Sequence, residues 1–385
     1  MDRTVIDLFF ALIRSQILGT GVFTDEQKDA ARALVEPLYT LSCQHDMAHL
    51  IGFSLFEAGL TDVYEPFEKQ HMLSVFRGES IVYEQAHACD LLAAAEIPHL
   101  PLKGAVLRSL YPEPWMRPSC DVDVLVKENH LDRAVKILCE NGYSVREKTS
   151  HDVGLISSGH VPTELHFRLW ENGQNQEICD ILDSVWAAST PVVDSPYTYE
   201  MPDELFYFYH VAHMAKHVEH GGCGIRPLLD LWLLDKNADD LLDARNALLE
   251  KGGLLRFVEA ARTLCRAWFD GQTLDPVSAE LEAYVLSGGV YGSEKNRIAF
   301  QQQQRGGRVR YALSRIFVPF ADLKVHFPVL NKCPWLMPVM HVCRWFKLLF
   351  CGGAKRSLDE LNYSQHVSQK TADRMKQLLS NLGLQ

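Results

Sequence analysis

Hydrophobic residues in the first quarter of the chain recur every three or four positions, which is the spacing of one buried face of a helix. The pattern runs through "VIDLFFALIRSQIL", "DMAHLIGFSLFEAGL" and "HMLSVFRGESIVYEQAHACDLLAAAE". It predicts an N-terminal helical region over residues 1–96, in which no residues suggest chemistry.

The pattern changes at Ile97, where shorter apolar runs interrupted by Pro and Gly begin. The segments that follow alternate between the spacing of strands and the spacing of helices. They are the apolar run "IPHLPLKG", a brief helix in "AVLRSLY", a buried strand in "CDVDVLV", an amphipathic helix in "HLDRAVKILCENGY", and strands in "SVREK", "DVGLIS" and "TELHFRLW". This alternation predicts an α+β fold with a small mixed sheet, and residues 97–200 are the expected catalytic domain.

Helical spacing returns after residue 200. Residues 201–290 are predicted to form a helical domain that begins with "PDELFYFYHVAHMAKHVEH" and continues through "RPLLDLWLLDK" and "LLRFVEAARTLCRAWF". Residues 291–385 are expected to form a C-terminal loop and a helical tail, with the polar and basic stretch "QQQQRGGRVR" as the loop.

Composition narrows the class of protein. The 385-residue chain is 47% hydrophobic and 23% charged, which is ordinary for a soluble globular protein. Its formal net charge of -11 disfavours a nucleic-acid partner, so a small-molecule or protein acceptor is expected. The N-terminus lacks the pattern of a signal peptide, and the ten cysteines include no CxxC pair. Reduced thiols and a cytoplasmic location are therefore expected.

No apolar run is long enough to span a bilayer, so no transmembrane segment is expected. Residues 328–351 nevertheless mix large aromatic residues with basic ones, which suits peripheral contact with a membrane surface. The residues concerned are Trp335, Trp345 and Phe346, with Lys332, Arg344 and Lys347. Packing against the helical domain is the preferred interpretation of this stretch.

Carboxylates gather in two of the predicted strands. Asp121 and Asp123 are two residues apart in "CDVDVLV", and Glu164 is followed at the same spacing by His166 in "TELHF". Because side chains in a strand alternate between faces, each pair lies on one face of its strand. If the two strands are neighbours, three carboxylates converge, and such a group suits Mg²⁺ or Mn²⁺. The simpler alternative is an idle, solvated pair of aspartates, and His166 is expected to be a hydrogen-bonded strand residue rather than a ligand.

The run "LKGAVLRSLYPEPWMRPSCDVDVLV", followed by "TELHF" and later by "HMAKHVEHGGCGIRPLLDLWLL", resembles the uncharacterised nucleotidyltransferase family of the DNA polymerase β-like superfamily. The resemblance covers most of residues 97–240. It implies that Asp121 and Asp123 are the metal-binding pair and that Glu164 is the third catalytic carboxylate. It also implies that Lys103 and Gly104 begin the helix that cradles the triphosphate.

One position departs from the wider superfamily, which usually begins its nucleotide loop with Gly-Ser where this chain has Lys103-Gly104. The hydroxyl group is absent, but a lysine can contact phosphate as a point charge. Arg117 is either a second phosphate contact or a partner that neutralises the aspartates.

These residues predict a nucleotidyltransferase that uses Mg²⁺ or Mn²⁺ and moves a nucleoside monophosphate from a nucleoside triphosphate such as ATP to an unidentified acceptor, releasing pyrophosphate. The alternative is a catalytically silent protein of the same fold that binds a nucleotide or a partner.

Histidines at positions 210, 213, 217 and 220 share roughly one face of a predicted helix. A zinc site is one interpretation, but no acidic residue stands between His213 and His217 as in an HExxH motif. The preferred interpretation is a helix face packed on the catalytic domain, with His213, Lys216 and His217 near the nucleotide.

The glycines that follow this helix, Gly221, Gly222 and Gly224, either approach a phosphate together with Arg226 or join two helices. On the second helix, Arg226 and Asp230 are four residues apart and are expected to form an ion pair.

Overall fold

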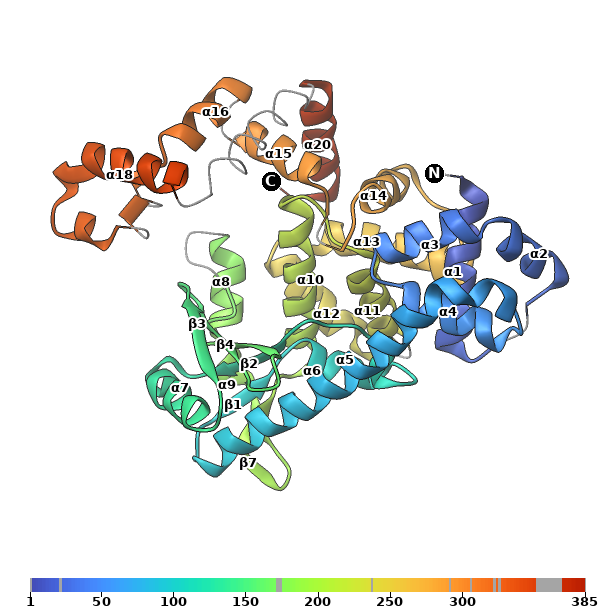
Figure 1. Cartoon of the computed structure of the whole chain (residues 1–385), viewed down its shortest axis with the longest axis horizontal. Helices are drawn as coiled ribbons and strands as arrows, with labels where there is room; N and C mark the ends of the chain where they lie inside the picture. The colour runs from blue at the N-terminus through green and yellow to red at the C-terminus, as the bar shows by residue number, and fades with distance from the viewer. Residues whose placement is uncertain are drawn as a thin grey trace. The chain divides into compact units, whose positions relative to one another are not determined.

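The computed structural model describes residues 2–20, 23–170, 175–236, 238–290, 292–304, 307–320, 323–324, 327–350 and 369–384. The chain divides into two compact units. Unit 1 comprises residues 1–216 and 224–290, and unit 2 comprises residues 217–223 and 291–385. The predicted α+β class is confirmed, because one seven-stranded mixed sheet is accompanied by helical regions at both ends of the chain (Figure 1).

The N-terminal region is helical, as its pattern predicts. Its helices are α1 (Arg3–Leu18), α2 (Asp25–Ala33), α3 (Val35–Gln44), α4 (Ala48–Glu57) and the long α5 (Thr61–Ala94). Local sequence fixes two of their starts. The Asp2 side chain accepts a hydrogen bond from the Thr4 amide, and Thr24 and Gln27 form a reciprocal capping box.

The sheet of unit 1 has the strand order β3-β4-β5-β2-β1-β7-β6. Its strands are β1 (His99–Pro101), β2 (Val122–Val126), β3 (Ser144–Lys148), β4 (Asp152–Ile156), β5 (Pro162–His166), β6 (Thr190–Val192) and β7 (Ser195–Glu200). Strand β2 is parallel to β5 and antiparallel to β1, so the sheet is mixed. The hairpin formed by β6 and β7 has no counterpart in the sequence-based prediction.

One face of the sheet is the core of the catalytic region. Val122, Val124 and Val126 of β2 cluster with Leu165 of β5 and with buried residues of α5 and α7 (Leu131–Glu140). Alternation then directs Asp123 to the other face. The helix α7 ends at Asn141 and Gly142 as predicted, and Gly142 has the positive φ of 94° that its position requires.

Between the sheet strands and after them, unit 1 contains short and long helices. They are α6 (Gly104–Leu107), η1 (Arg108–Leu110), η2 (Pro114–Met116), η3 (Glu128–His130), α8 (Gln176–Asp183), α9 (Val185–Ala188), α10 (Asp203–Glu219), α11 (Ile225–Asp235), η4 (Asp239–Leu241), α12 (Leu242–Lys251), α13 (Leu255–Asp270) and α14 (Pro276–Leu286). The last three residues of α10 fall in unit 2.

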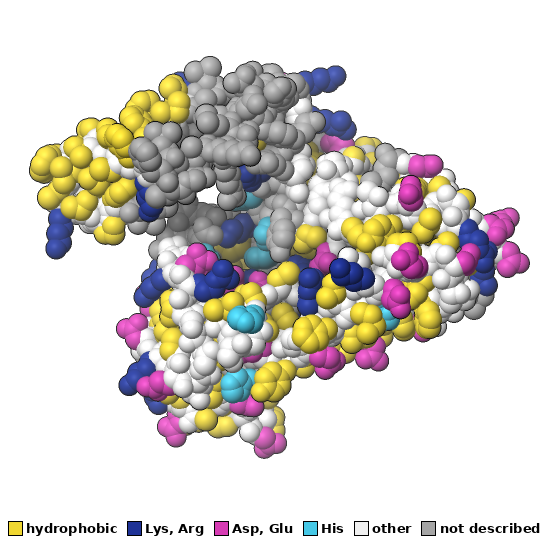
Figure 2. All heavy atoms as spheres, in the orientation of Figure 1, with side chains coloured by type: hydrophobic (Ala, Val, Ile, Leu, Met, Phe, Trp, Pro, Cys, Tyr) yellow, Lys and Arg dark blue, Asp and Glu magenta, His cyan; other side chains and the backbone are white. Residues whose placement is uncertain are grey.

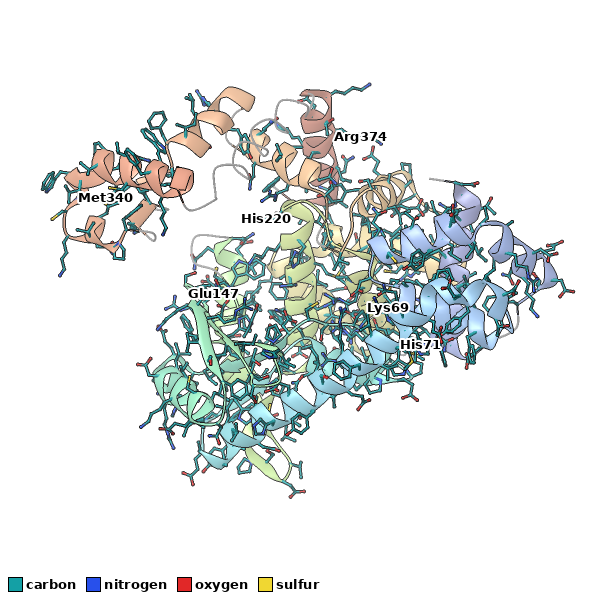
Figure 3. The ribbon with its side chains drawn as sticks, in the orientation of Figure 1. Lys69, His71, Glu147, His220, Met340 and Arg374 are labelled. Atoms are coloured by element: carbon teal, nitrogen blue, oxygen red, sulfur yellow. The ribbon has the colours of Figure 1, made fainter. Side chains whose placement is uncertain are left out.

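Unit 2 contains α15 (Glu294–Gln304), α16 (Arg308–Ile316), η5 (Pro328–Asn331), η6 (Pro334–Leu336), α18 (Met337–Phe350) and α20 (Gln369–Leu382). Hydrophobic side chains gather over α16 and α18 (Figure 2), and Met340 marks α18 in the stick view (Figure 3). No helix in the described part of the chain is long and apolar enough to cross a membrane.

The loop expected over "QQQQRGGRVR" is wrong for most of its length. The four glutamines form the last turn of α15, and Arg308 begins α16. Glutamine is a good helix former, and Gln302 is buried beside the helix core residues Ile298 and Ala299. Tertiary packing thus extends the helix through a polar stretch, while Arg305 and Gly306 lie outside the described residues.

Candidate active site

Two carboxylates meet on the face of the sheet opposite the valine core. Asp123 in β2 is the direct register partner of Glu164 in the parallel strand β5. Residues paired in this way project to the same side of a sheet. His166, two residues after Glu164, therefore lies on that side as well, as the alternation in the sequence predicts.

Asp123 is the buried centre of this group. Its carboxylate oxygen Oδ1 lies 2.9 Å from Lys103 Nζ and 2.9 Å from His166 Nε2. Burial alone would raise the pKa of Asp123, but Lys103 and His166 outweigh burial and hold the pKa well below its usual range. The carboxylate is therefore ionised, and its charge is shared by two cationic or hydrogen-bonding partners.

The same atoms suit a divalent cation. His166 Nε2 is 3.3 Å from Glu164 Oε2, and ligand atoms of Asp123, Glu164 and His166 all lie within 4.8 Å of one another. The two carboxylates supply the oxygen ligands that Mg²⁺ and Mn²⁺ prefer, and the imidazole of His166 stands beside them. A second possible group joins His151 and Asp152 to His166. His166, expected to be a supporting residue, thus belongs to both groups.

Asp121 stands just before β2 and is partly buried. Burial raises the pKa of Asp121, and repulsion from Asp123 raises it further, while Lys103 opposes both effects. The structure therefore brings the charge of Asp121 to the site. Among the described residues, however, the close groups of possible ligand atoms do not include Asp121.

The loop at Lys103-Gly104 is bent sharply. Lys103 has φ 39° and ψ -105°, a conformation that a non-glycine residue rarely adopts and that costs of order 1–3 kcal/mol. Burial opposes the charged lysine, but Asp123 outweighs burial and raises the pKa of Lys103. Helix α6, which begins at Gly104, has only four residues, so it offers much less dipole than a long helix.

Arg117, expected to contact either a phosphate or the aspartates at the start of β2, is bound to Asp230 of α11 instead. Its Nε and one Nη donate to the two carboxylate oxygens of Asp230, both at 2.8 Å, and both residues are buried. The Tyr111 hydroxyl donates to the same carboxylate at 2.8 Å. The prediction of an ion pair between Arg226 and Asp230 is wrong. Arg117 binds Asp230, and Arg226 donates to the Pro118 carbonyl oxygen.

The helix α10 brings further polar residues to the site. Burial raises the pKa of Tyr209 to about 12; Lys103 opposes this rise, and Asp123 and Glu164 add to it. The phenol therefore lies within electrostatic reach of the carboxylates. His213 follows one turn later, with its ring 6.3 Å from that of Tyr209. Lys216 Nζ lies 5.5 Å from the ring of Trp170, which follows β5. Tyr209 was not predicted, although its position four residues before His213 on one helix face was a signal.

The histidines of α10 do not act as one group. His210 is buried against the Pro227 carbonyl oxygen at 3.0 Å, and burial lowers its pKa. His217 and His220 belong to unit 2, where the ring of His220 lies 5.4 Å from that of Phe300. Neither close group of possible metal ligands in the described residues includes a histidine of α10.

The glycine turn after α10 joins two helices. Gly221 and Gly222 have φ of 128° and 123°, and the Gly221 carbonyl oxygen accepts a hydrogen bond from the Ser293 amide. A Cβ atom on Gly292 would stand 2.2 Å from the Gly221 oxygen, so the two backbones pack directly on each other. This packing favours the joining role of the turn over a phosphate contact.

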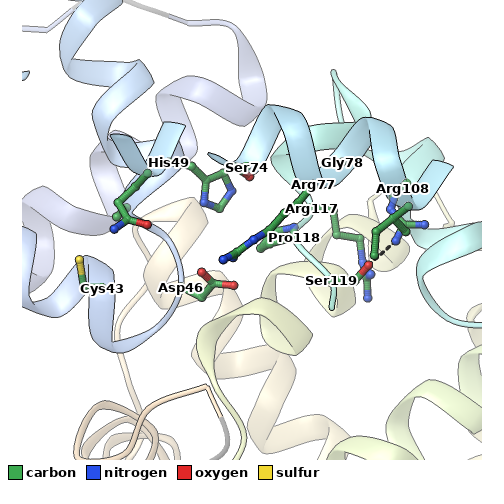
Figure 4. A pocket seen from close by; sticks show the side chains of 13 residues that line it. Cys43, Asp46, His49, Ser74, Arg77, Gly78, Arg108, Arg117, Pro118 and Ser119 are labelled. Carbon is green, nitrogen blue, oxygen red and sulfur yellow. Dashed lines mark hydrogen bonds between the residues drawn. The ribbon is translucent and has the colours of Figure 1, made fainter. Parts of the chain in front are cut away.

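A cavity of about 130 Å³ lies between α5 and the segment before β2 (Figure 4). Arg77, Arg108 and Arg117 line it, and Arg108 donates to the Ser119 hydroxyl. Burial and the neighbouring Arg117 lower the pKa of Arg108 to about 10. Arg108 was not predicted, although it lies within the "LKGAVLRSLY" segment that carried the resemblance.

A larger cavity of about 1020 Å³ is lined mainly by apolar residues, many of which come from α5, β1, α6, β7 and the start of α10. They include Leu100, Ala105 and Phe206. Leu100 pairs with Leu125, which is two residues from Asp123 and shares its face. Phe206 lies one turn before Tyr209 on α10. The cavity has room for a small molecule, but Asp123, Glu164 and His166 are not among its lining residues.

Comparison with known proteins gives one match. A family described as "Uncharacterised nucleotidyltransferase" matches residues 33–270. That range includes the sheet and every residue of the carboxylate site. No curated protein and no solved structure matches the chain.

Proposed function

Because the chain belongs to the uncharacterised nucleotidyltransferase family, we propose that it transfers a nucleoside monophosphate from a nucleoside triphosphate to a small-molecule or protein acceptor and releases pyrophosphate. The observation that supports this most directly is the register pairing of Asp123 with Glu164. The pairing gathers carboxylates at one point of the sheet, where they could hold the divalent cations that accompany a triphosphate.

We assign cation binding to Asp123 and Glu164, with His166 beside them and Asp121 contributing negative charge. A bound Mg²⁺ or Mn²⁺ would polarise the reacting phosphate and lower the pKa of the acceptor hydroxyl. Lys103 holds the Asp123 carboxylate ionised and is the residue we assign to the triphosphate. Gly104 lets the Arg108 guanidinium approach the start of α6, because a Cβ there would stand 2.9 Å from it.

His213 and Lys216 are proposed as further nucleotide contacts, since they share a face of α10 with Tyr209. His217, the third residue expected near the nucleotide, belongs to unit 2 and is not assigned to the site. Arg117 is not proposed as a phosphate contact, because its guanidinium is bound to Asp230.

The test is a screen of labelled nucleoside triphosphates, including ATP, with Mg²⁺ or Mn²⁺ against a cell extract. We expect transfer of label to an extract component, release of pyrophosphate, and loss of both in Asp123→Asn. Label transfer that survives in Asp123→Asn would contradict the assignment of the site. Nucleotide binding without pyrophosphate release from any acceptor would support the silent binding protein instead.

A further inference from the structure

The C-terminal part of the chain has the opposite charge to the rest. Residues 291–385 contain 15 Lys and Arg but 5 Asp and Glu, a formal charge of +10. Residues 1–290 contain 23 Lys and Arg and 44 Asp and Glu, a formal charge of -21. Such asymmetry within one chain indicates an anionic partner for the basic part.

The same part carries a concentration of exposed apolar side chains. Of the nineteen large hydrophobic residues that are exposed among the described side chains, nine lie between residues 313 and 346. Four of them follow helical spacing along η6 and α18, namely Trp335, Val339, Val342 and Phe346, with exposed fractions of 74%, 50%, 43% and 57%. We call these four residues the apolar stripe; Trp335 lies in η6 and the other three on α18, where hydrophobic side chains gather in Figure 2.

The other side of α18 already has a packing partner within unit 2. The ring of Phe317, which follows α16, lies 5.7 Å from Trp345 and 6.0 Å from His341. The Trp345 indole Nε1 also donates to the Ile316 carbonyl oxygen at 3.1 Å. Helix α18 is therefore fixed to the end of α16 by one side, and the apolar stripe is left exposed on another.

Basic residues accompany the stripe. Lys332 and Lys347 are exposed at the two ends of the η6–α18 segment. The fourteen residues of α18 span about 21 Å, which is shorter than the roughly 30 Å hydrocarbon core of a bilayer. A short helix with an apolar stripe, an exposed Trp and flanking lysines is typical of a helix that lies in the plane of a membrane interface.

We propose that the apolar stripe, with Lys332 and Lys347, docks on the surface of an anionic lipid bilayer. Nucleic acid would satisfy the basic residues but would gain little from burying Val339 and Val342, which a bilayer interface does bury. The inference does not depend on nucleotidyl transfer, so Asp123→Asn should dock as well as the native protein.

The experiment is co-sedimentation of the full chain with vesicles of phosphatidylcholine alone and with vesicles that also contain phosphatidylserine. We expect binding to the anionic vesicles, a decrease with added salt, and a blue shift of Trp fluorescence. Lys332→Gln and Lys347→Gln should each weaken binding about fivefold. The double variant Trp335→Ser, Val339→Ser should weaken it more than tenfold.

The matched control is the double variant Phe76→Ser, Tyr83→Ser, which removes two exposed aromatic residues of α5 with exposed fractions of 71% and 69% and should leave vesicle binding unchanged. The proposal is overturned if the native chain does not bind anionic vesicles, or if the stripe variants bind as tightly as the control. If vesicle binding is absent and the two lysines are needed for RNA binding, the surface is assigned to RNA. If vesicle binding is absent and Trp335→Ser breaks a dimer, the stripe is assigned to a second copy of the chain.

Discussion

Asp123 carries two contacts on a single carboxylate oxygen, one from Lys103 Nζ and one from His166 Nε2. Its side chain is 5% exposed, so solvent screens both contacts only weakly. Asp121, two residues earlier, is partly buried and has no ion pair among the interactions of the described residues. The two aspartates therefore differ in what they contribute to stability, although they resemble each other in sequence.

The substitution Asp123→Asn is expected to lower the free energy of unfolding by about 2 kcal/mol in the absence of divalent cations, because it leaves Lys103 and His166 without a counter-charge. Asp121→Asn should leave stability within about 0.5 kcal/mol. Both variants should lose transfer activity. Chemical denaturation of the two proteins in the presence of a chelator measures the difference. Equal stability of the two variants would show that the contacts to Asp123 are not stabilising.

The proposed role of Lys216 in nucleotide binding can be tested against a matched control, because a second lysine of the chain, Lys236, also lies over a tryptophan ring. Lys216 lies over Trp170 at 5.5 Å, and Lys236 lies over Trp232 at 5.3 Å. Lys216→Met should weaken nucleoside triphosphate binding about tenfold through loss of one charge-assisted contact. Lys236→Met should have no effect on it. Titration of nucleotide followed by Trp fluorescence or by calorimetry measures both, and similar losses in the two variants would remove Lys216 from the site.

At the scale of elements, the segment before β2 is tied to α11 by a buried ion pair. Arg117 reaches Asp230 across 113 positions of the chain, and Tyr111 adds a hydrogen bond to the same carboxylate. Burial raises the pKa of Asp230, but Arg117 outweighs burial and lowers the pKa overall. The pair thus holds the start of β2, and with it Asp121 and Asp123, against the helix that follows α10.

Breaking this pair with Asp230→Asn should cost about 3 kcal/mol of unfolding free energy near neutral pH, because Arg117 would be left buried without its anion. Since the pKa of Asp230 is lowered by folding, its contribution is complete above the unfolded pKa of about 3.9. The gap between the native protein and the variant should therefore stay constant from pH 8 to about pH 5 and shrink only below about pH 4.

Denaturant unfolding at a series of pH values measures this gap. Asp243→Asn, a change of an exposed aspartate in α12, is the control and should leave stability unchanged. A gap that closes between pH 8 and pH 5 would contradict the sign of the Asp230 shift.

At the scale of the whole molecule, the carboxylate site belongs to one unit. Asp121, Asp123, Glu164, Lys103 and Tyr209 are all in unit 1, and the family match ends at residue 270. Residues 291–385 belong to unit 2, which contains the basic, apolar surface of α18. Because they belong to different units, nucleotide binding and vesicle binding are expected to be separable.

A chain that ends at residue 290 is therefore expected to bind a nucleoside triphosphate as tightly as the full chain, while losing vesicle binding. Some loss of stability is expected, because Gly221 and Gly222 lose their packing against Gly292. Calorimetry measures the affinity, and circular dichroism checks that the shortened chain is folded. A folded chain with much weaker nucleotide binding would show that unit 2 supplies part of the site.

The sequence by itself determined the features that depend on neighbours along the chain. Period-two spacing placed Glu164 and His166 on one strand face, and valines at alternate positions predicted the buried face of β2. The stop at Asn141 and Gly142 follows from the conformational freedom of glycine. The family likeness also rested on local motifs, and the basic character of residues 291–385 can be counted directly.

The tertiary structure alone decided which residues meet across the chain. Arg117 was a candidate for phosphate or for the aspartates, and only packing selected Asp230, since a buried guanidinium binds whichever carboxylate is brought into its plane. Lys103, Arg108 and Tyr209 became neighbours of the carboxylates through the sheet register and the position of α10. The hairpin β6–β7 and the helical glutamines of α15 were also set by packing, because their local patterns were too weak to define a fold without the surfaces they cover.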